Sequence, residues 1–279
     1  MPKIFNKDII DTEMLREGAL RRVLLDDMIT SNDNIRLDHL ALELGCTMSL
    51  SVAAGDITWL QVLDGTVRIS GSEGTHTLGN HHLTFLPGGF EGQLEGDTDA
   101  QMLHARVPDA ARFDPAFADT PPGFRIIDWS KEPVLDSTHD ARKRIYFVTP
   151  QLFATKAISG EMIIYPPNTI ASNHYHEGAE HFQYVISGKG IVYTNDEPHR
   201  LRQGDIVYNY EHERHYFECD GSENFVFVEF FVPGEFKTVW VEDAPICTWE
   251  PTGKNIKGGP PSREISAHSS QPVETPADV

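Results

Sequence analysis

The sequence predicts an all-β protein built from two similar domains in tandem, and three observations support this fold class. Sliding the chain against itself by 123 residues, without a gap, places Gly65 on Gly188 and the run WLQVLDG (59–65) on FQYVISG (182–188). A constant offset between matching segments indicates a repeated structural unit. Runs rich in Val, Ile and aromatic residues are short and are bounded by turn residues, as strands are. With 279 residues, the chain is long enough for two domains that each have a core.

The first segment, residues 1–34, is expected to be a short arm with the clearest helical pattern of the chain. From Thr12 to Met28, apolar residues recur at steps of three and four, and Asp11 or Thr12 is a possible N-cap. The apolar positions are Met14, Leu15, Ala19, Leu20, Val23 and Leu24. We expect this helix to pack on the first domain or on a partner subunit. Because small β-domains leave edge strands that need covering, the arm predicts a homodimer.

The rest of the chain divides at changes in composition. Residues 35–108 hold the first copy of the repeat, and residues 141–250 hold the second. Residues 109–140, which include a Pro-Pro pair, are predicted to connect the two domains. Residues 251–279 are rich in Pro, Gly and Ser and have no apolar periodicity. We expect this last segment to be disordered or to lie on the surface.

The second copy contains a cluster of histidines. The run NHYHEGAEH (173–181) holds His174, His176 and His181, and His215 follows in the run HERHYF. Residues two apart on a strand point to the same face, so His174 and His176 can bind one ion. Imidazole nitrogen suits iron, copper, nickel and zinc, and it also serves manganese. The pattern predicts a site for one divalent transition metal, without selecting the metal.

The spacing around these histidines resembles the two signature motifs of the cupin superfamily. The first motif is seen in Pro167-Asn168, five residues, His174-x-His176, four residues, His181, six residues and Gly188. The second is seen in Gly204-Asp205 followed by Tyr210-x-His212-x-x-His215. The resemblance implies two tandem cupin barrels, each a double-stranded β-helix or jelly roll. It also implies that His174, His176, His181 and His215 are the metal ligands.

The first copy lacks these ligands. The 123-residue offset places Ser51, Ala53, Thr58 and Gly92 where the second copy has its four histidines. None of these side chains can replace an imidazole. The sequence therefore predicts one metal ion per chain, in the C-terminal barrel alone.

The third ligand has two candidates. Counting back from Gly188 reaches His181, whereas the shorter spacing allowed in the cupin motif reaches Glu180. Neighbours on a strand point to opposite faces, so both cannot bind the ion. The gap-free register favours His181, because a shift would turn the whole strand over. Glu180 would then orient an imidazole, act in catalysis or face solvent.

Other polar residues lie near the motifs. Gln183 has the phase of His181 and would point into the barrel, where it can bind substrate or make a structural contact. Tyr210 lies next to the second motif, and its phenol can donate to bound oxygen or substrate. Glu180, Gln183 and Tyr210 are therefore the catalytic candidates. Arg142 and Arg144 belong to a basic cluster that is expected at a solvated strand edge, although one side chain can reach in to bind a substrate carboxylate.

Composition excludes several classes of partner. The net charge of −19 opposes binding to nucleic acids or to anionic membranes. No apolar run has the length of a signal peptide or a membrane span, and the three cysteines have no paired spacing. These features predict a cytoplasmic protein whose substrate is a small molecule.

The sequence favours one reaction class over two alternatives. A site of neutral histidines leaves two open positions on an octahedral ion, which suits a chelating organic acid, enol or phenol with oxygen beside it. The favoured hypothesis is an Fe(II)-dependent dioxygenase that cleaves a C–C bond, because histidine-only cupins include ring-cleaving enzymes. The first alternative is redox-silent chemistry with Mn, Ni or Zn, as in isomerases, lyases and decarboxylases of small carboxylates or sugar acids. The second is a bicupin that binds a ligand without turnover.

Overall fold

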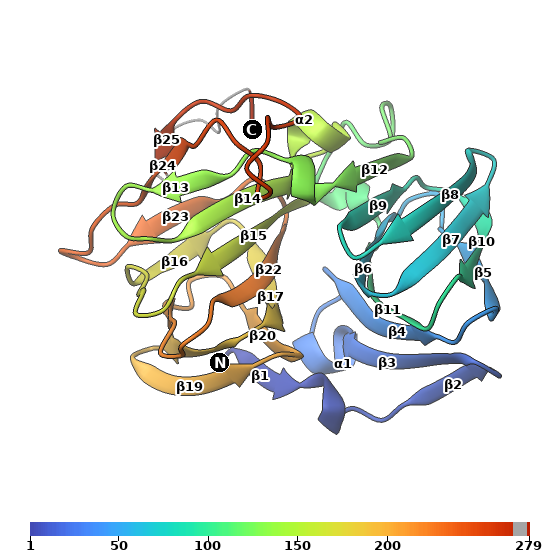
Figure 1. Ribbon diagram of the computed structural model, residues 1–279, viewed down its shortest axis with the longest axis horizontal. Coiled ribbons are helices and arrows are strands. Elements are labelled where there is room, and N and C mark those ends of the chain that lie inside the picture. Colours follow the sequence, from blue (N-terminus) through green and yellow to red (C-terminus); the bar gives the residue numbers. More distant parts are fainter. Residues whose placement is uncertain (270–277) are drawn as a thin grey trace. The chain divides into compact units, whose positions relative to one another are not determined.

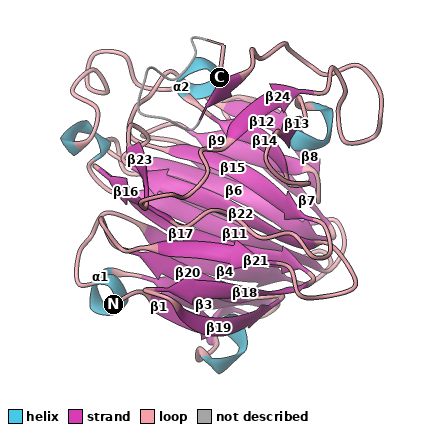
Figure 2. Cartoon of the chain, turned by 90° about the vertical axis from the view of Figure 1, so that its left-hand side faces the viewer, coloured by secondary structure: helices cyan, strands magenta, loops and turns pink. Residues whose placement is uncertain are grey.

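The computed structural model describes residues 1–269 and 278–279. Figure 2 shows that strands dominate the chain and that helices are few and short. The described residues form the helices α1 (Asp27–Thr30) and α2 (Pro150–Phe153) and 3-10 turns at Lys7–Ile9, Ala110–Arg112 and Trp129–Lys131. No helix among them is long and apolar enough to span a membrane. The prediction of an all-β fold is confirmed.

The described chain forms two compact units. The N-terminal unit comprises Lys7–Trp129 and Phe153–Ala157. The C-terminal unit comprises Met1–Asn6, Ser130–Leu152 and the chain from Ile158 to Val279. Each unit therefore includes segments that lie outside the two copies of the sequence repeat.

The N-terminal unit consists of two sheets around an apolar core (Figure 1). The larger sheet has the order β12 (Arg125–Asp128), β9 (His82–Leu86), β6 (Ile57–Asp64), β11 (Ala100–Val107), β4 (Arg36–Leu42), β3 (Ala19–Leu25) and β2 (Glu13–Arg16). The smaller sheet has the order β5 (Thr47–Ser51), β10 (Glu91–Gly96), β7 (Thr66–Gly71) and β8 (Gly74–Gly79).

The C-terminal unit repeats this arrangement with additional strands (Figure 1). Its larger sheet has the order β1 (Lys3–Asn6), β20 (Asp205–Asn209), β17 (Glu180–Ser187), β22 (Phe225–Val232), β15 (Ser159–Tyr165), β14 (Lys143–Val148), β13 (Leu135–Ser137), β24 (Thr248–Pro251) and β25 (His268–Ser269). Its smaller sheet has the order β19 (Glu197–Arg202), β18 (Lys189–Thr194), β21 (His215–Glu218), β16 (His174–Glu177) and β23 (Lys237–Trp240).

The strands of the two units follow the 123-residue offset of the sequence. The bounds of β4, β6, β7, β8 and β9 coincide, after this shift, with those of β15, β17, β18, β19 and β20. A register shift also recurs at matching places, directly after Val62 in β6 and directly after Val185 in β17. The tandem repeat that the sequence predicts is therefore present strand by strand.

The glycine that follows β6 and β17 shows why the repeat keeps this residue. Gly65 and Gly188 have φ angles of +75° and +78°, which L side chains rarely adopt. A Cβ atom at either position would lie 2.1 Å from a backbone oxygen, that of Asp99 or of Asn224. The turn therefore admits no side chain in either unit.

The helix predicted for Thr12 to Met28 is wrong. This segment forms the hairpin of β2 and β3, and only Asp27–Thr30 is helical. Gly18, with φ +77°, turns the chain between the two strands, and β3 pairs with β4 along its length. Pairing with an existing sheet outweighs the weak local helix preference of the segment.

The predicted connection and tail also contribute strands. Residues 109–140 supply β12 to the N-terminal sheet and β13 to the C-terminal sheet. In the predicted tail, β25 pairs with β24, and Ile265 and Val279 are buried against Trp249. Residues 251–269 follow the surface of the C-terminal unit, and Ile265 is the one buried residue among them, so the surface alternative describes this segment better than disorder. Residues 270–277 lie outside the described residues.

Candidate metal centre

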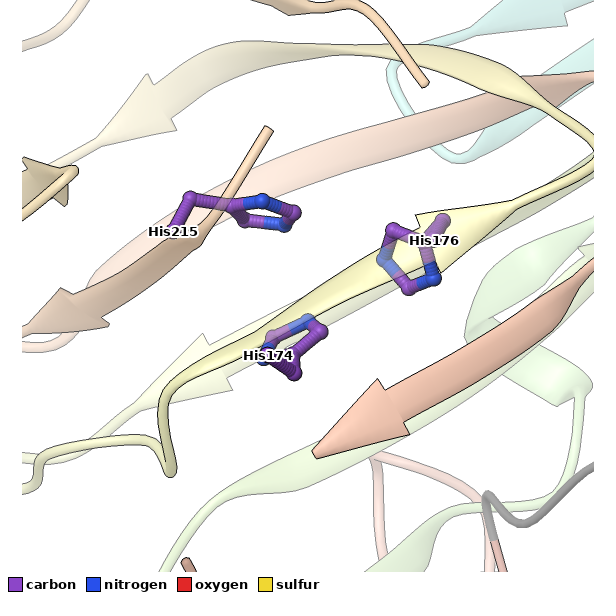
Figure 3. Close-up of side chains that lie close together, drawn as sticks. All are labelled: His174, His176 and His215. Carbon is purple, nitrogen blue, oxygen red and sulfur yellow. The ribbon is translucent and has the colours of Figure 1, made fainter. Parts of the chain in front are cut away.

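The four histidines of the motifs come from both sheets of the C-terminal unit, from two strands of the smaller sheet and one of the larger. His174 and His176 lie on β16, His181 lies on β17, and His215 lies on β21. Strands β16 and β21 are paired directly through His174 and His215. Figure 3 shows the rings of His174, His176 and His215 gathered around one space. The alternation of β16 puts both of its histidines on the inner face, as their spacing predicts.

The imidazole rings pack closely and are largely buried. Ring centroids are 4.6 Å apart for His174 and His215, 4.7 Å for His176 and His181, and 4.7 Å for His181 and His215. His176, His181 and His215 are buried, whereas His174 is half-buried. The side of the cluster at His174 is therefore the one that solvent reaches.

Hydrogen bonds to the outer nitrogens direct the inner nitrogens of two rings toward the cluster. Nδ1 of His174 lies 2.8 Å from the carbonyl of Ser172, and Nδ1 of His215 lies 2.8 Å from the carbonyl of Glu213. A carbonyl only accepts, so each Nδ1 is protonated and each Nε2 has a free lone pair. This is the arrangement of outer hydrogen bonds that orients metal-binding imidazoles.

The remaining nitrogens of the cluster also suit an ion. Nε2 of His176 is buried and has no hydrogen-bond partner among the described residues. Nε2 of His181 lies 3.2 Å from the amide nitrogen of Asn209 and 3.2 Å from Nε2 of His215. Without an ion, a proton on Nε2 of His181 makes this contact a hydrogen bond, and a cation bound by both nitrogens would take the place of that proton. Two metal–nitrogen bonds of about 2.1 Å at a right angle would separate the atoms by about 3.0 Å.

Burial keeps the imidazoles neutral. Desolvation lowers the pKa of His215 to about 4. Desolvation, and next the charge of neighbouring histidines, lowers the pKa of His174, His176 and His181 well below the usual value. Metal binding requires neutral imidazole, so the site is in its ligand form at neutral pH. The four residues therefore fit a divalent transition metal.

The two candidates for the third ligand lie in different surroundings. His181 joins the ring cluster, whereas Glu180 accepts a hydrogen bond from the hydroxyl of Tyr208. The ring of Tyr208 in turn contacts Tyr210 at 5.2 Å. The catalytic candidates Glu180 and Tyr210 therefore both lie next to Tyr208, whereas His181 lies in the ring cluster. The ligand role of His181 stays a prediction.

Gln183, the third catalytic candidate, lies beside the histidines. Its side chain is fully buried, accepts from Asn209 at 3.1 Å and donates to Glu229. Glu229, on β22, also lies 3.6 Å from Nε2 of His181. Donor atoms of His181, His215 and Glu229 fall within 4.8 Å of one another, so Glu229 is a further group that can approach the ion.

Sequence reasoning missed Glu229 and its neighbour Glu161. Burial raises the pKa of both carboxyl groups, that of Glu229 to about 8, and the charge of Glu161 adds to the effect on Glu229. Glu161 pairs with Arg144 at 3.0 Å. A signal was present, because each glutamate is the single charge in an apolar strand, in GEMIIY and in FVFVEFFV. Such a residue is seldom buried unless it is paired or functional.

The expectation that Arg142 and Arg144 lie at a solvated strand edge is wrong. Arg142 is buried, holds Asp140 at 2.6 Å and lies over the ring of Tyr165. Arg144 lies over the ring of Trp249 at 4.1 Å, and only 16% of its side chain is exposed. The sequence did not reveal these contacts, because the segment that forms β24 and contains Trp249 was not predicted to be a strand.

The N-terminal unit offers no comparable cluster among the described residues. The residue that corresponds to His215 is Gly92, where a Cβ atom would lie 2.3 Å from the carbonyl oxygen of Ser70. The residue that corresponds to His181 is Thr58, which is fully buried. Sterics at Gly92 therefore exclude an imidazole without a backbone shift.

Comparisons with known proteins agree with this architecture. Residues 161–231 match the family described as the cupin domain. No curated protein sequence matches the chain. Two structures of oxalate decarboxylase from Bacillus subtilis, both of substituted variants, match with TM-scores of 0.69 and 0.68. A structure of the same enzyme described for its Mn(II) centres matches with a TM-score of 0.67. Each match has 16% identity and covers 85% of this chain and 79% of the other.

An identity of 16% shows a common fold and does not carry residue roles across. The fold of both units, the repeat that relates them and the match of residues 161–231 lead to one conclusion. The chain has the fold of a bicupin, two cupin barrels in tandem, and its histidine cluster lies in the C-terminal barrel.

Proposed function

We propose that this bicupin is a metal-dependent enzyme that acts on a small carboxylate. In this proposal His174, His176, His181 and His215 hold one divalent ion. The observation that carries it is the convergence of these imidazoles, with Nε2 of His181 and Nε2 of His215 only 3.2 Å apart and Nε2 of His176 buried without a hydrogen-bond partner among the described residues. Mn(II) is the first metal to test, and Fe(II), which the sequence favours, is the second.

We propose decarboxylation as the reaction class, in preference to the oxygen-dependent cleavage that the sequence favours. A bound divalent ion would polarise the substrate and stabilise negative charge that develops on it. In decarboxylation the bond to the carboxyl carbon breaks, carbon dioxide leaves, and the electron pair stays on the remaining carbon, which takes up a proton. Glu229, beside His181 and hydrogen bonded to Gln183, lies where it can transfer that proton.

Other side chains give the site its dry walls. The ring of Phe231 stacks on His181 at 4.9 Å, and Phe236 contacts His176 at 5.1 Å. Apolar walls strengthen the interaction between a charged substrate and the groups that hold it. The fold of oxalate decarboxylase, an enzyme whose name gives a small dicarboxylate as its substrate, supports the same class.

The test distinguishes the reaction classes by the gas that each one releases or consumes. The metal-loaded protein is given oxalate, 2-oxo acids and 3-oxo acids, and carbon dioxide release and oxygen uptake are measured together. Carbon dioxide release without oxygen uptake supports the proposal. Oxygen uptake in step with substrate loss supports the dioxygenase instead, and substrate binding without turnover supports a ligand-binding bicupin.

Metal content provides a control. His174→Ala, His176→Ala and His215→Ala should each reduce retained metal and activity together. His199→Ala, on β19, should retain both, because His199 is not part of the cluster. Full metal retention in the first three variants would contradict the proposed site.

A further inference from the structure

A polar row crosses the inner face of the larger sheet of the C-terminal unit. Four residues lie directly opposite one another on β14, β15, β22 and β17, namely Tyr146, Glu161, Glu229 and Gln183. Gln183 is two residues from His181, at the histidine cluster. Tyr146 is two residues from Arg144, at the opposite end. The row therefore joins the proposed metal site to a guanidinium group.

The guanidinium group of Arg144 is held in place by three neighbouring side chains. Its Nη1 donates to the hydroxyl of Tyr146 at 2.8 Å, its Nη2 lies 3.0 Å from Glu161, and its carbon lies 4.1 Å from the ring centre of Trp249. The Nε atom is buried and has no hydrogen-bond partner among the described residues. An unpaired N–H of a buried charge is unfavourable and points to an acceptor that occupies the place in the working protein.

Two carboxyl groups connect Arg144 to the histidine cluster. Glu229 lies 3.6 Å from Nε2 of His181. Glu161, the present partner of Arg144, is itself hydrogen bonded to Glu229. A substrate carboxylate between the histidine cluster and Arg144 would therefore meet a fixed positive charge. That charge is already paired with the carboxylate of Glu161.

We propose that Arg144 binds a carboxylate of the substrate at the end remote from the metal, so that the substrate is a dicarboxylate longer than oxalate. This inference rests on the proposed function, because the ion fixes one end of the substrate. Three strand spacings of about 4.8 Å separate β14 from β17, so the backbones lie about 14 Å apart. The side chains of Arg144 and His181 span part of that distance, and a chain of several carbons suits the remainder. A planar guanidinium group favours a carboxylate, which it can bind with two hydrogen bonds.

The experiment measures binding and does not require turnover. Calorimetry on the Mn(II)-loaded protein gives the dissociation constants of glutarate, of pentanoate, which lacks the second carboxylate, and of oxalate, which is too short to reach Arg144. Glutarate should bind at least about tenfold more tightly than pentanoate. Equal affinity for the two, or no binding of glutarate, would overturn the inference.

Two variants separate substrate binding from a structural role of Arg144. Glu161→Gln removes the internal competitor and should tighten glutarate binding. The double variant Arg144→Gln with Glu161→Gln removes both charges, so no unpaired buried carboxylate is left at this pair to unfold the protein. It should bind glutarate at least about tenfold more weakly than Glu161→Gln, with the affinities for pentanoate and oxalate unchanged. An unchanged affinity for glutarate, or an equal loss for oxalate, would contradict the role of Arg144.

The same titrations in metal-free protein separate this inference from the proposed function. The contact between Arg144 and a carboxylate needs no ion, so the weaker glutarate binding of the double variant should persist without metal. A protein that retains no metal but keeps this difference would refute the metal site and support the role of Arg144. A protein that retains metal but binds glutarate equally well with and without Arg144 would support the metal site and refute the role of Arg144.

Discussion

At the scale of single residues, His181 and Glu180 provide the sharpest test of the proposed centre. His181→Ala should lower metal affinity by more than the roughly 10- to 100-fold that loss of an outer hydrogen-bond partner causes. Glu180→Ala should leave the metal in place, because Glu180 is bonded to Tyr208. Metal titration monitored by the Co(II) spectrum measures both. The opposite pattern would make Glu180 the ligand.

His39 predicts how stability depends on pH. This histidine of β4 is 2% exposed, and burial, with the charges of Lys7 and Arg22 next, lowers its pKa from 6.5 to about 4. Between these values the unfolded chain binds a proton that the folded chain does not. The stabilisation is complete above pH 6.5 and is lost as the pH falls toward 4, by up to about 3 kcal/mol.

Urea unfolding at pH 7.5 and pH 4.5 tests this expectation. In His39→Gln the free energy of unfolding should decrease less between the two pH values than in the unmodified protein. The difference between the two proteins isolates His39 from the histidines of the metal site. The same decrease in both would show that His39 is protonated in the fold.

At the scale of elements, β1 makes the C-terminal unit depend on the N-terminus of the chain. Asn6 of β1 donates to Asp205 of β20 at 2.6 Å, and both side chains are buried. Asn6→Ala should lower the free energy of unfolding by about 1–3 kcal/mol, because it leaves part of Asp205 without its partner. Lys3→Ala, on the same strand but half-buried, should change it by less. Chemical unfolding followed by tryptophan fluorescence measures both, and equal effects would contradict the importance of the Asn6 contact.

Strands whose alternating pattern recurs at the 123-residue offset could be predicted. Strands that depend on partners far away in the sequence could not. The WLQVLDG and FQYVISG segments showed β6 and β17, since their period and turn glycine are local features. The hairpin of β2 and β3 was missed because its pattern also fits a helix, and only the edge of β4 decides between the two. Likewise, the site histidines were found by spacing. Glu229 was not assigned to the site, and Arg144 was expected first at a solvated edge, because their partners lie on other strands.

At the scale of the whole molecule, the two units predict one metal ion per chain. Elemental analysis of the protein should give one equivalent, and the double variant His174→Ala with His176→Ala should give none. Gly92→His should add no metal and should destabilise the N-terminal unit, because its Cβ atom would meet the carbonyl of Ser70 at 2.3 Å. Two equivalents, one of which survives in the double variant, would contradict this.

The predicted homodimer remains a proposal, and the structure changes its basis. In place of a helix, the N-terminal segment presents β2 as the edge of a sheet, with Met14 69% exposed. An open edge with exposed apolar side chains favours pairing with a second copy. Sedimentation should show a dimer at micromolar concentration, and Met14→Lys should shift it toward monomer. A monomer in the unmodified protein would refute the proposal.

The place of β1 also means that this strand waits for its partner during synthesis. Asn6 and Asp205 are 199 positions apart, so β1 leaves the ribosome long before its partner strand exists. At about 5–20 residues per second, that interval lasts roughly 10–40 s. The N-terminal unit starts at Lys7 and can fold in this interval, while the strand before it stays unpaired. The nascent chain must therefore keep β1 available, and one edge of the C-terminal sheet depends on the earliest strand of the chain.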